Sequence, residues 1–183
     1  MIFLYTIGHS NHKFEKLAQL LKDNRITTLV DVRSAPYSRY TPHFNKDDLE
    51  FNLPRQEIEY IYEGKHLGGR PSDPSCYKNR KLPEEGADFL HEVDYPEMMK
   101  RPWFTKTVDR LLEIAEARPT AILCAEEDPV DCHRHHLISK YLMGVFAADE
   151  VEIRHIRGDG TVYSARSIHV SVDDPPEKQL PLF

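Results

Sequence analysis

One short segment of the chain, residues 121–136, holds more reactive side chains than packing alone requires. It reads AILCAEEDPVDCHRHH and places thiols, carboxylates, imidazoles and a guanidinium directly after an apolar run. Such groups supply nucleophiles, general bases and anion-binding groups. Because Pro129 marks a turn behind the apolar run, we predict that these groups stand at a strand-to-helix turn and form the floor of a functional site.

Polar side chains also accompany the ends of three other apolar runs, at residues 2–7, 27–32 and 151–156. They are His9, Ser10 and Asn11 for the first run, Asp31, Arg33 and Ser34 for the second, and His155 and Arg157 for the third. The carboxyl ends of parallel strands lie on one edge of a sheet, where ligands bind in α/β folds. We therefore predict that these groups share one cleft with the segment at 121–136.

The chemistry predicted for this cleft combines an acid or base with anion-binding groups. The catalytic candidates are His9, Asp31, Glu126 and Cys132. A helix start, together with the neighbouring imidazole and guanidinium, favours a thiolate at Cys132. The substrate-binding candidates are Ser10, Asn11, Arg33, Ser34, Gly68, Gly69, Cys124, His133, Arg134 and His155, of which the two arginines can clamp a phosphate or carboxylate.

Structural roles remain open for several of these residues. His9 and Ser10 can cap a helix, Asp31 can pair with a nearby arginine, and Cys124 can be a small core residue. A rhodanese-like site is disfavoured, because the loop after Cys124 is acidic and contains Pro129, which has no N–H group. The cysteine–arginine spacing of cysteine phosphatases is also absent from the sequence.

A metal site is an alternative reading of the same residues. Cys124, Cys132 and His133, with His9 or His155, offer a tetrahedral set of nitrogen and sulfur ligands. Their spacing matches none of the standard zinc patterns, so we expect neither a metal nor another cofactor. The next two residues, His135 and His136, are expected on the solvent face of the helix.

The elements that position these groups alternate between strand and helix. Apolar residues recur at helical spacing over 14–21, 103–117 and 137–145, between the apolar runs that read as strands. This order predicts an α/β domain of three layers with a mainly parallel sheet. Residues 34–101 read as a long irregular insertion, in which Gly68 and Gly69 mark a turn. We expect one domain over 1–172 and a flexible, polar, proline-rich tail over 173–183.

Composition limits the classes of partner. The chain has 183 residues, a net charge of −6 and three cysteines. The negative charge disfavours indiscriminate binding to nucleic-acid backbones, and the odd, low cysteine count indicates a reducing cytoplasm. No apolar run is long enough to span a membrane, and the N-terminus does not resemble a signal peptide. Basic residues that could contact a DNA backbone are nevertheless present at Arg33, Arg39, Arg70, Lys78, Arg80 and Lys81. Tyr37, Tyr40, Phe44 and Tyr77 interleave with them and can stack on bases or simply pack.

Five stretches of the chain together resemble the family known as domain of unknown function 488. They are TIGHSN at 6–11, LVDVRSAPYS at 29–38, LGGRP at 67–71, ILCAEEDPVDCHR at 122–134 and RHIRGDG at 154–160. The resemblance spans nearly the whole predicted domain. It implies an α/β fold and carries no established activity, so the function has to be argued from the residues.

A second resemblance concerns the sequence QLPLF at 179–183. It is similar to the peptide by which many bacterial replication and repair proteins dock on the DNA sliding clamp, with Gln179, Leu180, Leu182 and Phe183 as the specified positions. The alternative is that Leu182 and Phe183 fold back onto the protein itself. We predict a bacterial DNA-transaction protein that is recruited to the sliding clamp. We expect it to be a hydrolase or transferase that acts on nucleic acid or nucleotides. An enzyme acting on a small anionic metabolite and a non-catalytic adaptor remain the alternatives.

Overall fold

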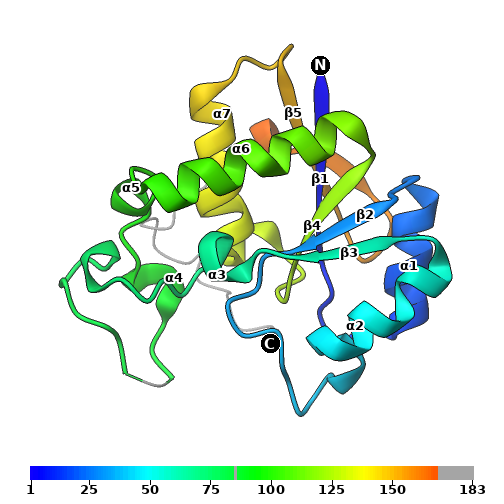
Figure 1. The fold of residues 1–183 in the computed structure, drawn as a ribbon, viewed down its shortest axis with the longest axis horizontal. Coiled ribbons are helices and arrows are strands. Elements are labelled where there is room, and N and C mark those ends of the chain that lie inside the picture. The colour runs from blue at the N-terminus through cyan, green and yellow to red at the C-terminus, as the bar shows by residue number, and fades with distance from the viewer. Residues whose placement is uncertain (85, 169–183) are drawn as a thin grey trace, which may run out of the picture.

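The fold is built on one six-stranded sheet, seen in a computed structural model that describes residues 1–84 and 86–168 (Figure 1). The strands lie in the order β3-β2-β4-β1-β5-β6. Their bounds are Ile2–Gly8 for β1, Thr28–Asp31 for β2, Glu59–Tyr62 for β3, Thr120–Cys124 for β4, Val151–Ile156 for β5 and Val162–Ser164 for β6. All neighbouring pairs are parallel except β5 with β6.

Helices cover both faces of this sheet and complete three layers. Helices α1 (Phe14–Asp23) and α2 (Lys46–Asn52) pack on one face, where Leu21 and Leu49 join a core with Leu123. Helices α6 (Pro102–Ala117) and α7 (Lys140–Val145) pack on the other, where Phe104 and Leu142 join a core with Ile122. Successive strand residues point to opposite faces, so β4 contributes to both cores. The predicted three-layer α/β fold is therefore confirmed.

The segment between β2 and α6, predicted to be irregular, contains several short elements. Besides α2 and β3 it carries α3 (Gly64–Leu67), α4 (Phe89–Glu92) and α5 (Tyr95–Met98). Short 3₁₀ turns lie at Pro42–Phe44, Pro54–Gln56 and Pro74–Cys76. In Figure 1, α4 and α5 lie to the left of the sheet, together with the long stretch of chain that leads from α3 to α4. The long connection thus forms a lobe beside one edge of the core.

Three central strands end at the same level. In the parallel register Gly8 of β1 pairs with Cys124 of β4, and Asp31 of β2 pairs with Leu123. The loops continue this pairing, because the N–H of His9 donates to the carbonyl oxygen of Cys124 at 3.0 Å. The residues that follow β1, β2 and β4 are therefore brought to one edge of the sheet.

The close approach of the loops after β1 and β4 requires a glycine. A Cβ atom on Gly8 would lie 1.7 Å from the carbonyl oxygen of Glu126, which no other residue can accommodate without moving backbone. Two residues later Ser10 adopts a left-handed conformation, with φ at 49°, as the chain turns toward α1. The TIGHSN stretch thus has a backbone role at this edge.

The starts of three helical segments differ in how they are capped. Helix α1 follows Lys13 and has no side-chain cap, so neither His9 nor Ser10 fills the capping role that the sequence left open. Asn45 precedes α2, but its side chain accepts a hydrogen bond from the N–H of Ser38 instead of capping the helix. Asp128 does act as a cap, because it accepts from the N–H of Val130 at 3.0 Å and begins a 3₁₀ turn at Pro129–Asp131.

The helix after this turn begins with a π-helical segment, Arg134–Ser139, before continuing as α7. All of its residues are buried, so the prediction that His135 and His136 face solvent was wrong. His135 lies against His155 of β5, and His136 donates from Nε2–H to the carbonyl oxygen of Val130 at 2.6 Å. The wider π turn places more consecutive side chains on the inner side than the helical period anticipates.

The part of the chain that the structure describes contains no helix long and apolar enough to cross a membrane. The predicted tail, with its clamp-binding residues Gln179, Leu180, Leu182 and Phe183, lies outside the described residues. The predicted domain boundary near residue 172 lies outside them as well.

Candidate functional site

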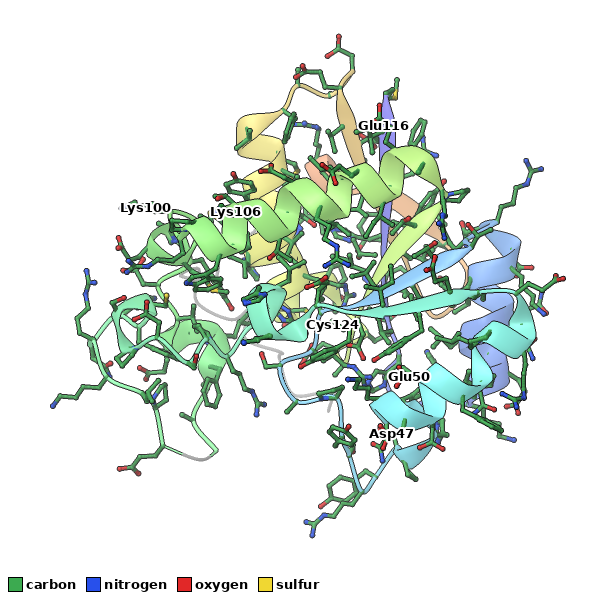
Figure 2. The ribbon with its side chains drawn as sticks, in the orientation of Figure 1. Asp47, Glu50, Lys100, Lys106, Glu116 and Cys124 are labelled. Atoms are coloured by element: carbon green, nitrogen blue, oxygen red, sulfur yellow. The ribbon has the colours of Figure 1, made fainter. Side chains whose placement is uncertain are left out.

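A cavity of about 830 Å³ opens at the edge where β1, β2 and β4 end. Its floor includes the residues that follow these strands, and its walls come from the loop after β2 and from the region of α4 and α5. Figure 2 shows Cys124 at the end of β4, in the central part of the molecule. The volume falls in the range of small-molecule sites.

At the floor, two thiols surround one imidazole. The Sγ atom of Cys124 lies 3.4 Å from Nδ1 of His133, and that of Cys132 lies 3.8 Å from the same nitrogen. The Cys124 thiol also donates a hydrogen bond to Oε2 of Glu126 at 2.9 Å. Cys124, Cys132 and His133 are all buried. Cys124 and His133 nevertheless line the cavity, together with Glu126.

The backbone fixes the orientation of His133. Its Nε2–H group donates to the carbonyl oxygen of Val32 at 3.2 Å, so the lone pair on Nδ1 points toward the two sulfur atoms. Gly69 packs against the ring, because a Cβ atom there would lie 2.8 Å from Cγ of His133. Burial acts to lower the pKa of His133, but the neighbouring Cys132 and Glu126 raise it, and the net shift is upward.

Glu126 places a carboxylate beside the thiols. Burial acts to raise its pKa, whereas hydrogen bonds from Cys124, from its own backbone N–H and from Cys132 lower it, and the net shift is downward. The group is therefore ionised at neutral pH. Of the two carboxylates among the catalytic candidates, Asp31 and Glu126, only Glu126 lines the cavity.

Cys132 lies beneath the floor and does not line the cavity. Burial raises the pKa of its thiol well above the usual range, and the neighbouring Cys124 adds to the shift. The prediction of a thiolate at Cys132 was therefore wrong for the chain by itself. The helix start that was expected to stabilise the thiolate is buried, and the guanidinium of Arg134 binds backbone oxygens instead.

The end of β2 contributes a buried ion pair. Arg33 donates from Nε and Nη2 to the carboxylate of Asp31, and from Nη2 to the carbonyl oxygen of Phe44 at 2.8 Å. Arg33 lines the cavity, but these contacts occupy most of its N–H groups and balance its charge. Asp31 is fully buried and also accepts from the hydroxyl of Tyr60 at 2.7 Å. Arg33 thus presents a polar edge to the cavity rather than a free bidentate clamp.

His9 is held as a neutral imidazole beside this pair. Nη1 of Arg33 donates to Nε2 of His9 at 3.0 Å, so Nδ1 carries the proton and donates to the carbonyl oxygen of Ser10 at 2.7 Å. Burial and the positive charge of Arg33 lower the pKa of His9 to about 4. His9 lines the cavity, and its contacts make it a positioning group for Arg33.

Arg134 does not reach the cavity. Its side chain is fully buried and donates from Nη1 to the carbonyl oxygen of Glu126 and from Nη2 to that of Glu127, the latter at 2.6 Å. The prediction that Arg134 clamps a substrate anion was therefore wrong, because its guanidinium lies outside the cavity lining. Its guanidinium instead holds the loop after β4 in the conformation that aims Glu126 at the cavity.

His155 is also turned away from the predicted cleft. The His155 ring is fully buried. Its Nδ1 lies 2.7 Å from Oγ1 of Thr6, and its Nε2 lies 3.2 Å from Nδ1 of His135. Its neighbour Arg157 pairs with Glu127 at 2.5 Å. The end of β5 therefore packs and braces the loop after β4, and its polar groups do not join the site.

Of the predicted catalytic and substrate-binding residues, the cavity brings together His9, Ser10, Arg33, Ser34, Gly69, Cys124, Glu126 and His133. The remaining ones, Asn11, Asp31, Gly68, Cys132, Arg134 and His155, do not line it. Gly68 has a packing role, since a Cβ atom there would lie 2.2 Å from Oγ of Ser34. Asn11 is exposed and accepts only a long hydrogen bond from Ser10, at 3.4 Å.

One wall of the cavity was not predicted from the sequence. It consists of Ala87, Asp88, Phe89, Leu90, His91 and Tyr95, all from the region of α4 and α5. These residues show no periodicity or motif that would have marked them, and only long-range packing brings them to the carboxyl edge. The lining from the loop after β2 includes Tyr37 and Tyr40, whose interleaving with arginines was the one signal available in the sequence.

Comparison with known proteins adds one finding to this geometry. The family model described as "Domain of unknown function DUF488" matches residues 13–142, which is more than half of the chain. The stretches at 29–38, 67–71 and 122–134, which build much of the cavity floor, fall within the match. No curated protein and no solved structure matches the chain. The chain belongs to the DUF488 family of domains of unknown function.

Proposed function

We propose that this protein is an enzyme acting on a nucleotide or a single-stranded nucleic acid, with the reacting part of the substrate in the cavity. One observation carries the proposal: a single cavity combines a floor of Cys124, Glu126 and His133 with an exposed aromatic rim of Tyr37 and Tyr40. The rim offers surfaces for bases, and the floor offers groups for chemistry.

The rim has the features of a base-stacking surface. Tyr37 is 58% exposed and Tyr40 is 78% exposed, although large aromatic side chains usually bury themselves. The guanidinium of Arg39 lies 4.8 Å from the ring centre of Tyr40, and that of Arg70 lies 4.6 Å from the ring centre of Phe89. Aromatic faces next to arginine are the kind of surface on which the bases of single-stranded nucleic acid stack.

The floor supports hydrolysis or group transfer. An ionised carboxylate at Glu126 can accept a proton from a water molecule or a substrate hydroxyl in the cavity. Arg33 supplies a hydrogen-bonding edge on the same wall as His9. This assignment makes Glu126 the catalytic residue and the Arg33–His9 pair a substrate-binding group.

The substrate assignment is tested by binding and turnover. We expect a labelled single-stranded oligonucleotide or a nucleoside monophosphate to bind, and Tyr37→Ala with Tyr40→Ala to weaken binding by roughly tenfold or more through lost stacking. Phe51→Ala is the matched control, because Phe51 is 60% exposed but lies on α2 outside the cavity. Glu126→Gln should keep binding and lose turnover of bound substrate, followed by chromatography. Equal affinities for the wild type and the double tyrosine variant would contradict the assignment.

Recruitment to a sliding clamp is the second part of the proposal. Its support is the sequence pattern of Gln179, Leu180, Leu182 and Phe183, together with a net charge of −6 that gives the protein little general attraction to DNA. Docking on a clamp would raise the local concentration of the enzyme on DNA without such an attraction.

The recruitment is tested with an immobilised bacterial clamp. We expect affinity on the micromolar scale, loss of binding when residues 179–183 are deleted, and retention of binding in Pro181→Ala, which changes only the unspecified position of the motif. Binding that survives the deletion would refute the docking role. The result is independent of the cavity, so the two parts of the proposal can fail separately.

A further inference from the structure

Three side chains that can ligate a metal meet at the floor of the cavity. The sulfur atoms of Cys124 and Cys132 and a ring nitrogen of His133 all lie within 4.8 Å of one another. Cys124 comes from the end of β4, whereas Cys132 and His133 follow the 3₁₀ turn at Pro129–Asp131. The fold thus closes a loop between the two cysteines and brings their sulfur atoms to the same imidazole.

The two sulfur-to-nitrogen distances in this cluster are close to those of a tetrahedral zinc site. Zinc–sulfur bonds of about 2.3 Å and zinc–nitrogen bonds of about 2.05 Å imply a sulfur-to-nitrogen separation of about 3.6 Å at tetrahedral angles. The corresponding separations are 3.4 Å for Cys124 and 3.8 Å for Cys132, each measured to Nδ1 of His133. Both ligand pairs need only shifts of a few tenths of an ångström to accept an ion.

The surroundings orient these groups for binding, and the two thiols would release their protons when the ion binds. The carbonyl oxygen of Val32 accepts a hydrogen bond from Nε2–H of His133, which leaves the lone pair on Nδ1 available to bind a metal ion. Metal-bound histidines commonly make such a bond through the second ring nitrogen. The backbone N–H of Arg134 points to Sγ of Cys132 at 3.4 Å, a contact that supports negative charge on the sulfur.

The third cysteine of the chain provides a comparison. Cys76 is also buried and free, but it lies in the 3₁₀ turn Pro74–Cys76 and belongs to the core cluster with Tyr77 and Val93. It does not belong to the Cys124–Cys132–His133 group. Cys76 therefore represents the ordinary core role of a cysteine, and its environment differs from that of the other two.

We propose that Cys124, Cys132 and His133 bind a Zn²⁺ ion whose fourth position opens into the cavity next to Glu126. Two thiolates and one imidazole form a soft, tetrahedral donor set that selects zinc over magnesium or calcium. Three protein ligands with one open position are the arrangement of catalytic rather than structural zinc sites. Two thiolates also balance the charge of the ion, so the buried unit is neutral.

At this site the ion could be reached from the cavity, and the carboxylate of Glu126 would lie close to it. Cys124 and His133 line the cavity, whereas Cys132 lies beneath them, so the open coordination position faces the hollow. Glu126 is next to Cys124, which places a carboxylate within reach of a zinc-bound water. The zinc site does not depend on the identity of the substrate proposed above.

The test is metal binding by the full chain, first stripped with a chelator and then titrated with Co²⁺ and Zn²⁺. We expect one Co²⁺ per chain, with the near-ultraviolet absorption of thiolate-to-cobalt charge transfer and the strong visible bands of tetrahedral cobalt, both removed by Zn²⁺. Cys132→Ser and His133→Gln should weaken binding by more than about tenfold. Cys76→Ser is the matched control and should bind as the wild type does.

Several outcomes overturn the proposal. A wild-type protein that binds cobalt without thiolate absorption, or binds far less than one ion per chain, refutes it, as does equal loss of binding in Cys76→Ser. If Cys132→Ser or His133→Gln fails to fold, the wild-type cobalt spectrum and a rise of the wild-type Tm with added Zn²⁺ decide the question. These measurements use no nucleotide, so a failure of the substrate proposal leaves them interpretable.

Discussion

Arg33 and Asp31 form a side-on ion pair at the end of β2, with Nε to Oδ1 at 2.9 Å and Nη2 to Oδ2 at 2.6 Å. Asp31 is fully buried and Arg33 is 7% exposed. The same guanidinium contacts His9 at the end of β1. The pair therefore links two strand ends, and it sets the polar edge that Arg33 presents to the cavity.

Removing one partner of this pair should be costly. Asp31→Asn leaves the buried guanidinium of Arg33 without its counter-charge, and we expect a loss of about 3 kcal/mol in the free energy of unfolding, measured by urea denaturation. Glu59→Gln serves as the control, because Glu59 forms a largely exposed pair with Arg118 and should cost less than about 1 kcal/mol. Similar losses in both variants would contradict the structural role of Asp31.

Arg134→Met should destabilise the loop after β4. The substitution keeps much of the apolar stem but leaves the carbonyl oxygens of Glu126 and Glu127 without their donor, at an expected cost of about 2–4 kcal/mol in unfolding free energy. Arg166→Met is the control, because it removes one hydrogen bond, from Arg166 to the carbonyl oxygen of Phe146. Its loss of unfolding free energy should therefore be smaller than that of Arg134→Met. A neutral result for Arg134→Met would show that water or a rearranged loop satisfies both oxygens.

Gly69→Ala should disturb the floor of the cavity. The added methyl group would lie 2.8 Å from the ring of His133, which is held on its other side by Val32, so we expect a loss of about 1–3 kcal/mol in urea denaturation. Gly144→Ala in α7 is the control, since a Cβ atom there meets nothing within 4 Å. That change should stabilise the protein by about 0.5–1 kcal/mol through helix propensity. Equal stability of the two variants would argue against the tight packing at Gly69.

The buried His155 predicts acid sensitivity. Burial, with the nearby positive charge of Arg134, lowers the pKa of His155 to about 2, whereas the unfolded chain has a histidine pKa of about 6.5. Between these values only the unfolded chain takes up the proton. The free energy of unfolding should therefore fall as the pH drops below about 6.5, by up to about 1.4 kcal/mol per pH unit.

His155→Gln isolates this contribution. The variant loses stability at pH 7 because the contact with Thr6 changes, but it no longer carries the titrating group. Between pH 7 and pH 5 its unfolding free energy should therefore change by about 2 kcal/mol less than that of the wild type. Parallel pH profiles for the two proteins would exclude His155 as a source of the acid sensitivity.

The fold could be predicted from the sequence because its signals are local. The apolar stretch Thr120–Cys124 is a strand as predicted, and the stripe predicted over 103–117 corresponds to α6, Pro102–Ala117. Alternation of such segments leads to a parallel sheet between two helical layers, since each amphipathic helix must bury its apolar side against the strands.

The membership of the site could be predicted only in part. Residues directly after β1, β2 and β4, such as His9, Arg33 and Glu126, reach the cavity because the parallel register aligns those strand ends. Arg134 and His155 have the same kinds of side chain at similar places, yet they turn inward. Their direction follows from the π-helical turn and from long-range hydrogen bonds, which residue types and spacing do not encode.

The sequence by itself determined the alternation of the main strands and helices along the chain, the edge where many of the reactive groups gather and the family to which the chain belongs. Hydrophobic periodicity and short motifs carry that information within a few residues. Only the tertiary structure decided which groups share the cavity and brought Cys124, Cys132 and His133 together. Those relationships depend on side-chain directions and on contacts between segments far apart in the chain, and both are set by the packing of the whole domain.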